Sequence, residues 1–237
     1  MQTIHVIGNQ QHLDSARLPG KVAVVIDVLF ATTTIAMALD GGAREVIAVP
    51  EIDEARSFAG EPDTILAGEK DAEIPDGFMT FAPLVLSKTQ LSGKRLVLVT
   101  TNGTVALKNS EGATHIYTAA LVNAAAIARH IVKNHFDETI LLVCSASRHR
   151  FNIEDYVGAG IIVDYLMRAD VNRFQPTDSA IAANTLAKPD RLTGILKDSR
   201  VGRMMSEMQL GMDVDFAARL DCYDIVPRFD NTRIVAV

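Results

Sequence analysis

Short runs of apolar residues, rich in Val and Ile, alternate with longer helical patterns along most of this 237-residue chain. Several of the runs are apolar at every position, which is typical of strands covered on both faces of a sheet. The predicted strands are 3–7, 22–27, 45–49, 64–67, 95–100, 115–117, 139–144 and 233–237, and the predicted helices are 33–40, 52–59, 103–109, 122–134 and 154–168. The alternation favours an α/β fold with a largely parallel or mixed sheet and right-handed crossovers.

Two regions break this alternation. Residues 60–93 contain three prolines and several glycines and are the most loop-like part of the chain. Residues 176–220 read as mostly helical, before a return strand at the C-terminus. The length suits one large α/β domain or two lobes. We therefore expect a single domain over 1–237, with a possible sub-lobe formed by 60–93 and 176–220.

The charge balance limits the partners of this chain. Lys and Arg number 23 against 29 Asp and Glu, and the net charge of −6 argues against nucleic acid or an anionic membrane surface as a partner. The apolar stretch 22–39 contains Asp27 and three consecutive threonines, so it indicates a strand, a turn and a helix rather than a membrane span. An anionic small molecule would have to meet local Arg or Lys side chains, backbone N–H groups or a metal ion.

The two cysteines, Cys144 and Cys222, make no disulfide framework, and the first residues lack the pattern of a signal peptide. We therefore expect a cytoplasmic protein. No coiled-coil or other self-association pattern stands out, which leaves a homo-oligomer open.

Asp27 ends an apolar strand and precedes a turn rich in hydroxyl groups. In open α/β sheets, ligands bind at the carboxyl ends of strands, so Asp27 stands where a metal ligand or a nucleophile would be. Thr32 and Thr33 could offer hydroxyls and helix N-terminal N–H groups to a phosphate. The structural alternative is that Asp27 only ends the strand and one threonine caps the helix.

A second polar turn, Thr101, Asn102, Gly103 and Thr104, follows the predicted strand 95–100. The Asn-Gly pair permits a positive φ, and successive backbone N–H groups there could form an anion-binding nest. The alternative is an ordinary helix cap. Two hydroxyl-rich strand–turn–helix units in one sheet favour a shared oxyanion site.

Acidic residues follow two further strands. Glu69 comes after strand 64–67, and Glu154 and Asp155 follow a basic run that begins at Arg148. Carboxylates beside arginines at a strand end suit a phosphate held partly by Mg²⁺, which takes one or two carboxylates plus substrate oxygens. Asn152 and Asp155 also have the spacing of a capping box, which is the structural alternative for one acidic residue.

Arg203 is a further candidate, because it could bind an anion bidentately, although arginines beside carboxylates on helices are usually surface pairs.

The sequence gives little support for other chemistries. The histidines show no zinc-ligand spacing, and His130 and His135 are expected to be exposed helix residues. A phosphatase of the haloacid dehalogenase type needs a second Asp two positions after the first, where this chain has Leu29. The nucleotide-binding and serine-hydrolase motifs are absent from the sequence.

Five blocks recur in a familiar order and spacing: VIDVLFATTT at 25–34, GE at 68–69, TTNGT at 100–104, FNIED at 151–155 with AG at 159–160, and DFA at 215–217 leading to VP at 226–227. From about residue 20 to residue 228 the chain resembles the 2-phosphosulfolactate phosphatase family. The resemblance implies a three-layer αβα fold and Mg²⁺-dependent hydrolysis of 2-phospho-3-sulfolactate to sulfolactate and phosphate, a step in coenzyme M or sulfolactate synthesis.

Two departures from the family pattern concern the substrate. Phe30 stands where the family usually has Arg, and the loss of such a contact is worth roughly 1.5–3 kcal/mol. The segment GFMTFAP at 77–83 is apolar where the family tends to carry Asp, Asn and Ser. A different phosphorylated hydroxy acid therefore stays open as the substrate.

We interpret the chain as a Mg²⁺-dependent phosphomonoesterase acting on a small phosphorylated acid. The catalytic candidates are Asp27, Glu69, Glu154 and Asp155, of which Asp27, Glu69 and Asp155 are the candidate metal ligands. The candidate phosphate- or substrate-binding residues are Thr32, Thr33, Thr101, Asn102, Gly103, Thr104, Arg148 and Arg203. Two alternatives remain: a non-catalytic protein that binds an organic acid or phosphate at a degenerate site, and a scaffold whose strand-end polar residues scatter over the surface.

Overall fold

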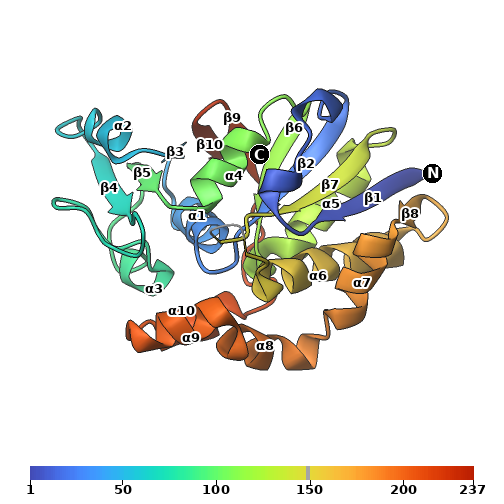
Figure 1. Ribbon diagram of the computed structural model, residues 1–237. Coiled ribbons are helices and arrows are strands. Elements are labelled where there is room, and N and C mark those ends of the chain that lie inside the picture. Colours follow the sequence, from blue (N-terminus) through green and yellow to red (C-terminus); the bar gives the residue numbers. More distant parts are fainter. Residues whose placement is uncertain (148–149) are drawn as a thin grey trace.

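The computed structural model describes residues 1–147 and 150–237, which form a ten-stranded mixed sheet flanked by helices (Figure 1). The strands are β1 (Gln2–Ile7), β2 (Lys21–Ile26), β3 (Glu45–Val49), β4 (Thr64–Gly68), β5 (Arg95–Val99), β6 (His115–Ala119), β7 (Thr139–Cys144), β8 (Phe174–Pro176), β9 (Pro227–Asp230) and β10 (Arg233–Ala236). They lie in the order β4-β5-β3-β10-β9-β6-β2-β7-β1-β8. All eight predicted strands are present, and β8 and β9 were not predicted.

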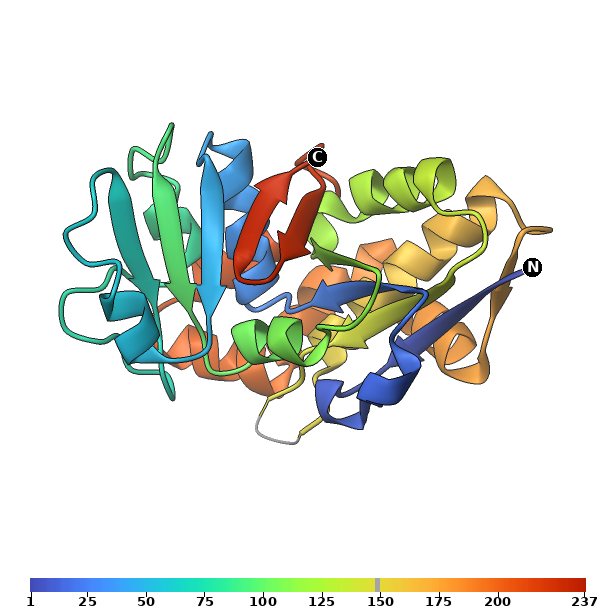
Figure 2. The same ribbon diagram turned by 90° about the horizontal axis from the view of Figure 1, so that it is seen from above.

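The sheet consists of two parallel halves joined by the β9–β10 hairpin. One half contains β4, β5 and β3, and the other contains β6, β2, β7, β1 and β8. Three antiparallel pairings in succession separate them, so the halves run in opposite directions. Strand twist accumulates across the sheet. Figure 2 shows the arrowheads of β3, β4 and β5 and the arrowhead of β2 directed toward the same central region.

Helices cover both faces of the sheet and complete the three-layer αβα arrangement. The helices are α1 (Ala31–Asp40), α2 (Ile52–Arg56), α3 (Pro83–Leu86), α4 (Gly103–Asn109), α5 (Ala124–Asn134), α6 (Ile153–Ala169), α7 (Asp178–Leu186), α8 (Leu192–Asp198), α9 (Arg200–Glu207) and α10 (Gly211–Ala217). The short helices α2 and α4 lie on one face, and α1, α5 and α6 lie on the other (Figures 1 and 2).

The apolar strands are buried because both of their faces are covered. In β3, Ile47 and Val49 pack with the α2 residue Ala55, whereas Val46 and Ala48 belong to the main core on the opposite face. Every residue of β3 is buried, which confirms the interpretation of continuous apolar runs as central strands.

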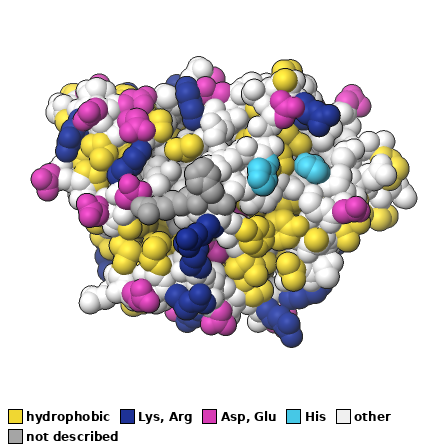
Figure 3. Space-filling model, in the orientation of Figure 1, with side chains coloured by type: hydrophobic (Ala, Val, Ile, Leu, Met, Phe, Trp, Pro, Cys, Tyr) yellow, Lys and Arg dark blue, Asp and Glu magenta, His cyan; other side chains and the backbone are white. Residues whose placement is uncertain are grey.

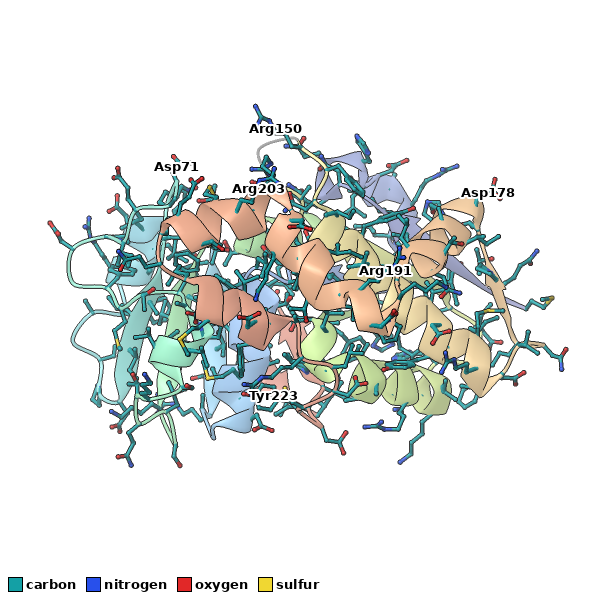
Figure 4. The ribbon with its side chains drawn as sticks, turned by 90° about the horizontal axis from the view of Figure 1, so that it is seen from below. Asp71, Arg150, Asp178, Arg191, Arg203 and Tyr223 are labelled. Atoms are coloured by element: carbon teal, nitrogen blue, oxygen red, sulfur yellow. The ribbon has the colours of Figure 1, made fainter. Side chains whose placement is uncertain are left out.

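The helices α8, α9 and α10 run across the bottom of the molecule, as Figure 4 shows from below. They connect the two sequence regions that break the strand–helix alternation: Leu84 of α3 donates its backbone N–H to the Asp213 carboxylate of α10 at 2.8 Å. Of the helices within residues 1–147 and 150–237, none combines the length and apolar character needed to cross a bilayer.

Candidate active site

A pocket of about 440 Å³ lies where the carboxyl ends of β2, β4, β5 and β7 come together. Its walls come from both halves of the sheet, from the loop after β7 and from α9. The polar lining includes Asp27, Glu69, Thr101, Asn102, Asn152 and Arg200. Strand-end polar residues therefore converge on one pocket, whereas a scaffold with an accidental likeness would scatter them.

Asp27 follows directly on β2 and is only 7% exposed. Thr32 fixes the turn: its hydroxyl accepts a hydrogen bond from the Asp27 N–H at 2.9 Å and donates to the Asp27 carbonyl oxygen at 2.8 Å. The Asp27 carboxylate accepts hydrogen bonds from the Ser145 hydroxyl and the Ala31 N–H. The turn after β2, together with Ser145 and Ala31, thus holds the Asp27 carboxylate in the pocket wall.

Gly103 starts α4 directly against the Asp27 carboxylate. A Cβ at this position would lie 2.7 Å from Asp27 Oδ2 and 2.4 Å from the Ala31 Cβ. Only glycine therefore lets α4 approach so closely, and this approach places the positive end of the helix beside a buried acid. Gly103 does not line the pocket, and in this structure it makes room for Asp27; its place in the phosphate site stays a prediction.

Glu69 reaches the pocket from the end of β4 and is 8% exposed. Gly68 has φ +145°, and a Cβ there would lie 2.0 Å from the Val99 carbonyl oxygen, so only glycine keeps β4 paired with β5 at this point. The Glu69 carboxylate accepts hydrogen bonds from the Thr101 N–H at 2.7 Å, the Thr101 hydroxyl at 2.8 Å and the Ala72 N–H at 2.7 Å. Glu69 thereby joins the loops that follow β4 and β5.

Asp155, near the start of α6, is fully buried and does not line the pocket. Its Oδ1 accepts from the Val28 N–H at 2.9 Å, and its Oδ2 accepts from the Ser145 hydroxyl at 3.1 Å and the Ala146 N–H at 3.2 Å. These bonds hold the loops after β2 and β7 together. Asp155 therefore braces two loops behind the pocket, and it forms no capping box, which corrects that interpretation. Its role as a metal ligand stays a prediction.

Ser145 was missed by the sequence interpretation, although it directly follows the apolar strand β7. Its hydroxyl contacts both Asp27 and Asp155. Asn152 occupies the N-cap position of α6 without making a side-chain cap bond, and its Oδ1 accepts from Arg200 Nη2 at 3.1 Å. A capping role was therefore the wrong interpretation of Asn152, which instead connects α6 to α9.

Glu154 is 1% exposed, interacts with Ser199 and Arg200 at the start of α9, and does not itself line the pocket. The Ser199 hydroxyl donates a hydrogen bond to its carboxylate, and the positive charge of Arg200 favours the ionised form of that carboxylate. Among residues 1–147 and 150–237, Glu154 Oε1 finds no hydrogen-bond partner. A buried carboxylate oxygen left without a partner is costly, and such positions in native proteins call for a bound ion, a water molecule or a catalytic role.

The buried acids of the site disfavour one another's ionisation. Burial, together with repulsion from Glu69 and Glu154, raises the pKa of Asp27 to about 7. Burial and repulsion from Asp27 and Glu154 hold the pKa of Asp155 well above its usual range, and burial raises the pKa of Glu154. Crowded carboxylates with one unpartnered oxygen are a hard-oxygen donor set that fits Mg²⁺.

The arginines at the pocket differ from those predicted. Arg148 lies outside the described residues. Arg203 is exposed, its Nη1 donates to the Asp198 carbonyl oxygen, and it does not line the pocket, so its role in substrate binding stays a prediction. Arg150 and Arg200 line the pocket instead. Figure 4 shows Arg150 and Arg203 along the same margin of the molecule, and Figure 3 shows Lys and Arg side chains distributed over the face drawn there.

The predicted hydroxyl groups fall into two sets. Thr101 and Asn102 line the pocket. Thr32, Thr33 and Thr104 are buried outside its lining, and their hydroxyls donate to backbone carbonyl oxygens four or five residues earlier at 2.7–2.8 Å. These three hydroxyls shape the turns and do not line the pocket, and a role for these threonines in phosphate binding stays a prediction.

The two departures from the family pattern meet in the pocket. Phe30 and Phe81 both line it, and their ring centroids are 6.0 Å apart at an interplanar angle of 40°. Val201, Met204 and Met205 of α9 extend this apolar wall. The pocket thus has an acidic floor, basic side chains at Arg150 and Arg200, and an apolar wall.

The fold and the site together define an α/β protein with a buried acidic site between the two halves of its sheet. The family model for 2-phosphosulpholactate phosphatase matches residues 8–232. A relative from Symbiobacterium thermophilum is 34% identical over 224 residues, covering 92% of this chain and 95% of its own. Relatives from Deinococcus radiodurans (36% over 210 residues, covering 87% and 86%) and Thermotoga petrophila (36% over 214 residues, covering 89% and 90%) are similar; all three are named probable 2-phosphosulfolactate phosphatase. This chain belongs to the 2-phosphosulfolactate phosphatase family.

Proposed function

We propose that this protein is a Mg²⁺-dependent phosphatase that hydrolyses 2-phospho-3-sulfolactate, or a related phosphorylated hydroxy acid, to the free hydroxy acid and phosphate. The observation that carries the proposal is the convergence of Asp27 and Glu69 on one pocket, with the Asp27 pKa raised to about 7 by burial and by repulsion from Glu69 and the buried Glu154. Strongly perturbed acids in a polar cleft are typical of catalytic sites. Membership of the family supports the reaction class.

Asp27, Glu69 and Glu154 would hold the Mg²⁺ ion. When bound, Mg²⁺ supplies charge neutralisation and orientation of phosphoryl oxygens. Glu154 offers its unpartnered Oε1 and Asp27 offers the carboxylate that faces the pocket. Asp155 takes the part of a positioning residue, because it holds the loops on which Asp27 and Ser145 stand.

The remaining polar residues would position the phosphorylated acid. Phosphoryl transfer depends on positioning and on neutralising charge more than on covalent work by the protein. Arg150 and Arg200 would pair with the phosphoryl oxygens or the second acidic group of the substrate, and Asn102 and Thr101 line the wall opposite. The stereochemical course at phosphorus, followed with a substrate whose phosphoryl group is made chiral by oxygen isotopes, distinguishes direct attack by water from an aspartyl-phosphate on Asp27, because one displacement inverts the configuration and two successive displacements retain it.

The apolar wall favours a second substrate within the same class. Phe30 and Phe81 present carbon surface where a sulfonate would need donors. A phosphorylated hydroxy acid with an apolar substituent would bury that surface, at about 25 cal/mol per Å². The two candidate substrates differ only in the group that faces this wall.

Phosphate release should be measured over a panel of 2-phosphorylated acids that carry a sulfonate, a carboxylate or an alkyl group, with and without Mg²⁺. We expect Mg²⁺-dependent turnover of at least one member and loss of turnover in Asp27→Asn. The substitution Asp76→Asn, on an exposed loop, is the matched control. Tight binding of an organic acid without turnover of any phosphorylated form would instead identify a non-catalytic binding protein.

A further inference from the structure

A second cluster of ligating side chains lies at the amino end of β6, away from the pocket. His115 is the first residue of β6, His135 follows α5, and Glu138 precedes β7. One ligand atom from each of the three residues lies within 4.8 Å of the others. His135 is 3% exposed, so its expected place on a helix surface is wrong. Sequence spacing could not show the cluster, because β6 brings His115 to the other two residues only through the sheet.

The separations approach those of a tetrahedral metal site. His135 Nδ1 lies 3.3 Å from Glu138 Oε1, and His115 Nε2 lies 3.9 Å from the same oxygen. Ligand atoms bound tetrahedrally at about 2.0–2.2 Å are roughly 3.4 Å apart, so His135 Nδ1 already lies at a suitable distance from Glu138 Oε1. His115 Nε2 must approach that oxygen by about half an ångström, and the ligand atoms of all three residues lie within 4.8 Å of one another. Glu138 Oε2 accepts from the Asp137 N–H at 3.2 Å, which leaves Oε1 directed at the histidines.

Neighbouring groups orient these ligands. Tyr117 Oη lies 2.9 Å from His135 Nε2 and 3.0 Å from His130 Nε2. Because a hydroxyl both donates and accepts, Tyr117 can accept a hydrogen bond from His135 Nε2–H and donate one to His130 Nε2. In that tautomer the lone pair of His135 Nδ1 is available to a cation. Gln2 Nε2 donates to the Glu138 carbonyl oxygen at 2.9 Å and holds the backbone there.

The cluster is accessible and separate from the active site. The side chains of His115 and Glu138 are 29% and 25% exposed, and His115 lines a pocket of about 210 Å³. In the β2–β6 ladder, His115 pairs with Val22, whereas Ala119 pairs with Ile26 next to Asp27. Four residues of strand place the two sites about 13 Å apart along β6.

We infer that His115, His135 and Glu138 form a binding site for a divalent transition-metal ion, with Zn²⁺ the best fit. Two imidazoles and one carboxylate suit Zn²⁺, Co²⁺ or Ni²⁺, whereas Mg²⁺ prefers oxygen ligands only. Three protein ligands leave a fourth position for water or another small ligand. The bound ion joins the start of β6 to the turn between α5 and β7.

Titration of the full-length metal-free protein with Co²⁺, in excess Mg²⁺ to occupy the carboxylate pocket, tests this site. We expect one equivalent of Co²⁺ to give visible d–d absorption typical of tetrahedral nitrogen and oxygen ligands, and Zn²⁺ to displace it. His115→Asn and Glu138→Gln should each weaken binding at least tenfold. His12→Asn, which changes an exposed histidine outside the cluster, is the matched control and should bind as the wild type does.

Thermal unfolding gives a second readout, since a ligand that binds only the folded state raises the Tm. Zn²⁺ should raise the Tm of the wild type and of His12→Asn, and not that of His115→Asn. The inference is overturned if no saturable Co²⁺ binding occurs, if both cluster variants bind normally, or if Mg²⁺ displaces Co²⁺. Phosphatase activity with Mg²⁺ is expected to survive in the cluster variants, so this test is independent of the proposed function.

Discussion

Replacement of Asp27 by Asn is expected to stabilise the metal-free protein while it abolishes phosphate release. Burial, together with repulsion from Glu69 and Glu154, raises the Asp27 pKa from 3.8 to about 7. At about 1.4 kcal/mol per pKa unit, keeping this carboxyl ionised in the folded protein costs about 4 kcal/mol. Asn has nearly the same shape and no charge, so Asp27→Asn removes that cost wherever Asp27 is ionised.

The same values set the pH window. Between pH 3.8 and about 7, the folded protein keeps a proton on Asp27 that the unfolded chain has released. The contribution of Asp27 to the free energy of unfolding therefore falls as the pH rises through this window and is constant above it. Below the window both states are protonated at Asp27, and the wild type and the variant should differ least there.

Urea unfolding at a series of pH values, in EDTA and in excess Mg²⁺, measures the difference. In EDTA the advantage of Asp27→Asn should grow with pH to about 4 kcal/mol above pH 7. Mg²⁺ should stabilise the wild type and leave the variant nearly unchanged. Asp76→Asn serves as the control and should follow the wild type. If Asp27→Asn is less stable than the wild type above pH 7, or if the gap does not depend on pH, the reasoning about crowded carboxylates is refuted.

Three further substitutions test the geometry around Asp27. Gly103→Ala places a Cβ 2.7 Å from Asp27 Oδ2, so kcat should fall about 100-fold. Circular dichroism should show that the variant is still folded. A wild-type kcat would contradict the close approach of α4 to Asp27. In Gly68→Ala the new Cβ would lie 2.0 Å from the Val99 carbonyl oxygen, at a residue with φ +145°. Urea unfolding should show that the free energy of unfolding falls by at least about 2 kcal/mol. An unchanged free energy of unfolding would mean that β4 does not pair with β5 in this way. Arg200→Ala should raise KM roughly tenfold or more and leave kcat less affected, since a charge-assisted contact is lost; an unchanged KM would remove Arg200 from the substrate site.

The sequence patterns predicted the strands better than their arrangement. Continuous apolar runs such as residues 45–49 identify central strands because both faces must be covered. The hairpin that reverses one half of the sheet was missed, because β9 is four residues long with alternate residues exposed, which is a weak pattern. Because β9 was missed, the predicted sheet contained fewer antiparallel pairings than the structure shows.

At the site, the sequence located the turns but not the direction of each side chain. Asp27 and Glu69 were predicted as site residues because each acid stands close to the end of an apolar strand, where ligands bind in α/β sheets. Thr32 and Ser145 could not be assigned from sequence, since a hydroxyl in a turn can face a ligand or a backbone carbonyl group with equal ease. Asp155 likewise has a spacing that fits a helix cap, and only the packing of β2 against α6 shows that it braces two loops.

A crystal of the protein grown with Mn²⁺ in place of Mg²⁺ tests the central claim most directly, because the anomalous signal of Mn²⁺ marks its position. The account predicts one strong peak in the pocket, within coordination distance of the Asp27 carboxylate and facing Glu154 Oε1 and Glu69. A pocket without a peak at saturating Mn²⁺, or a peak bound elsewhere with Asp27 uncoordinated, would contradict it.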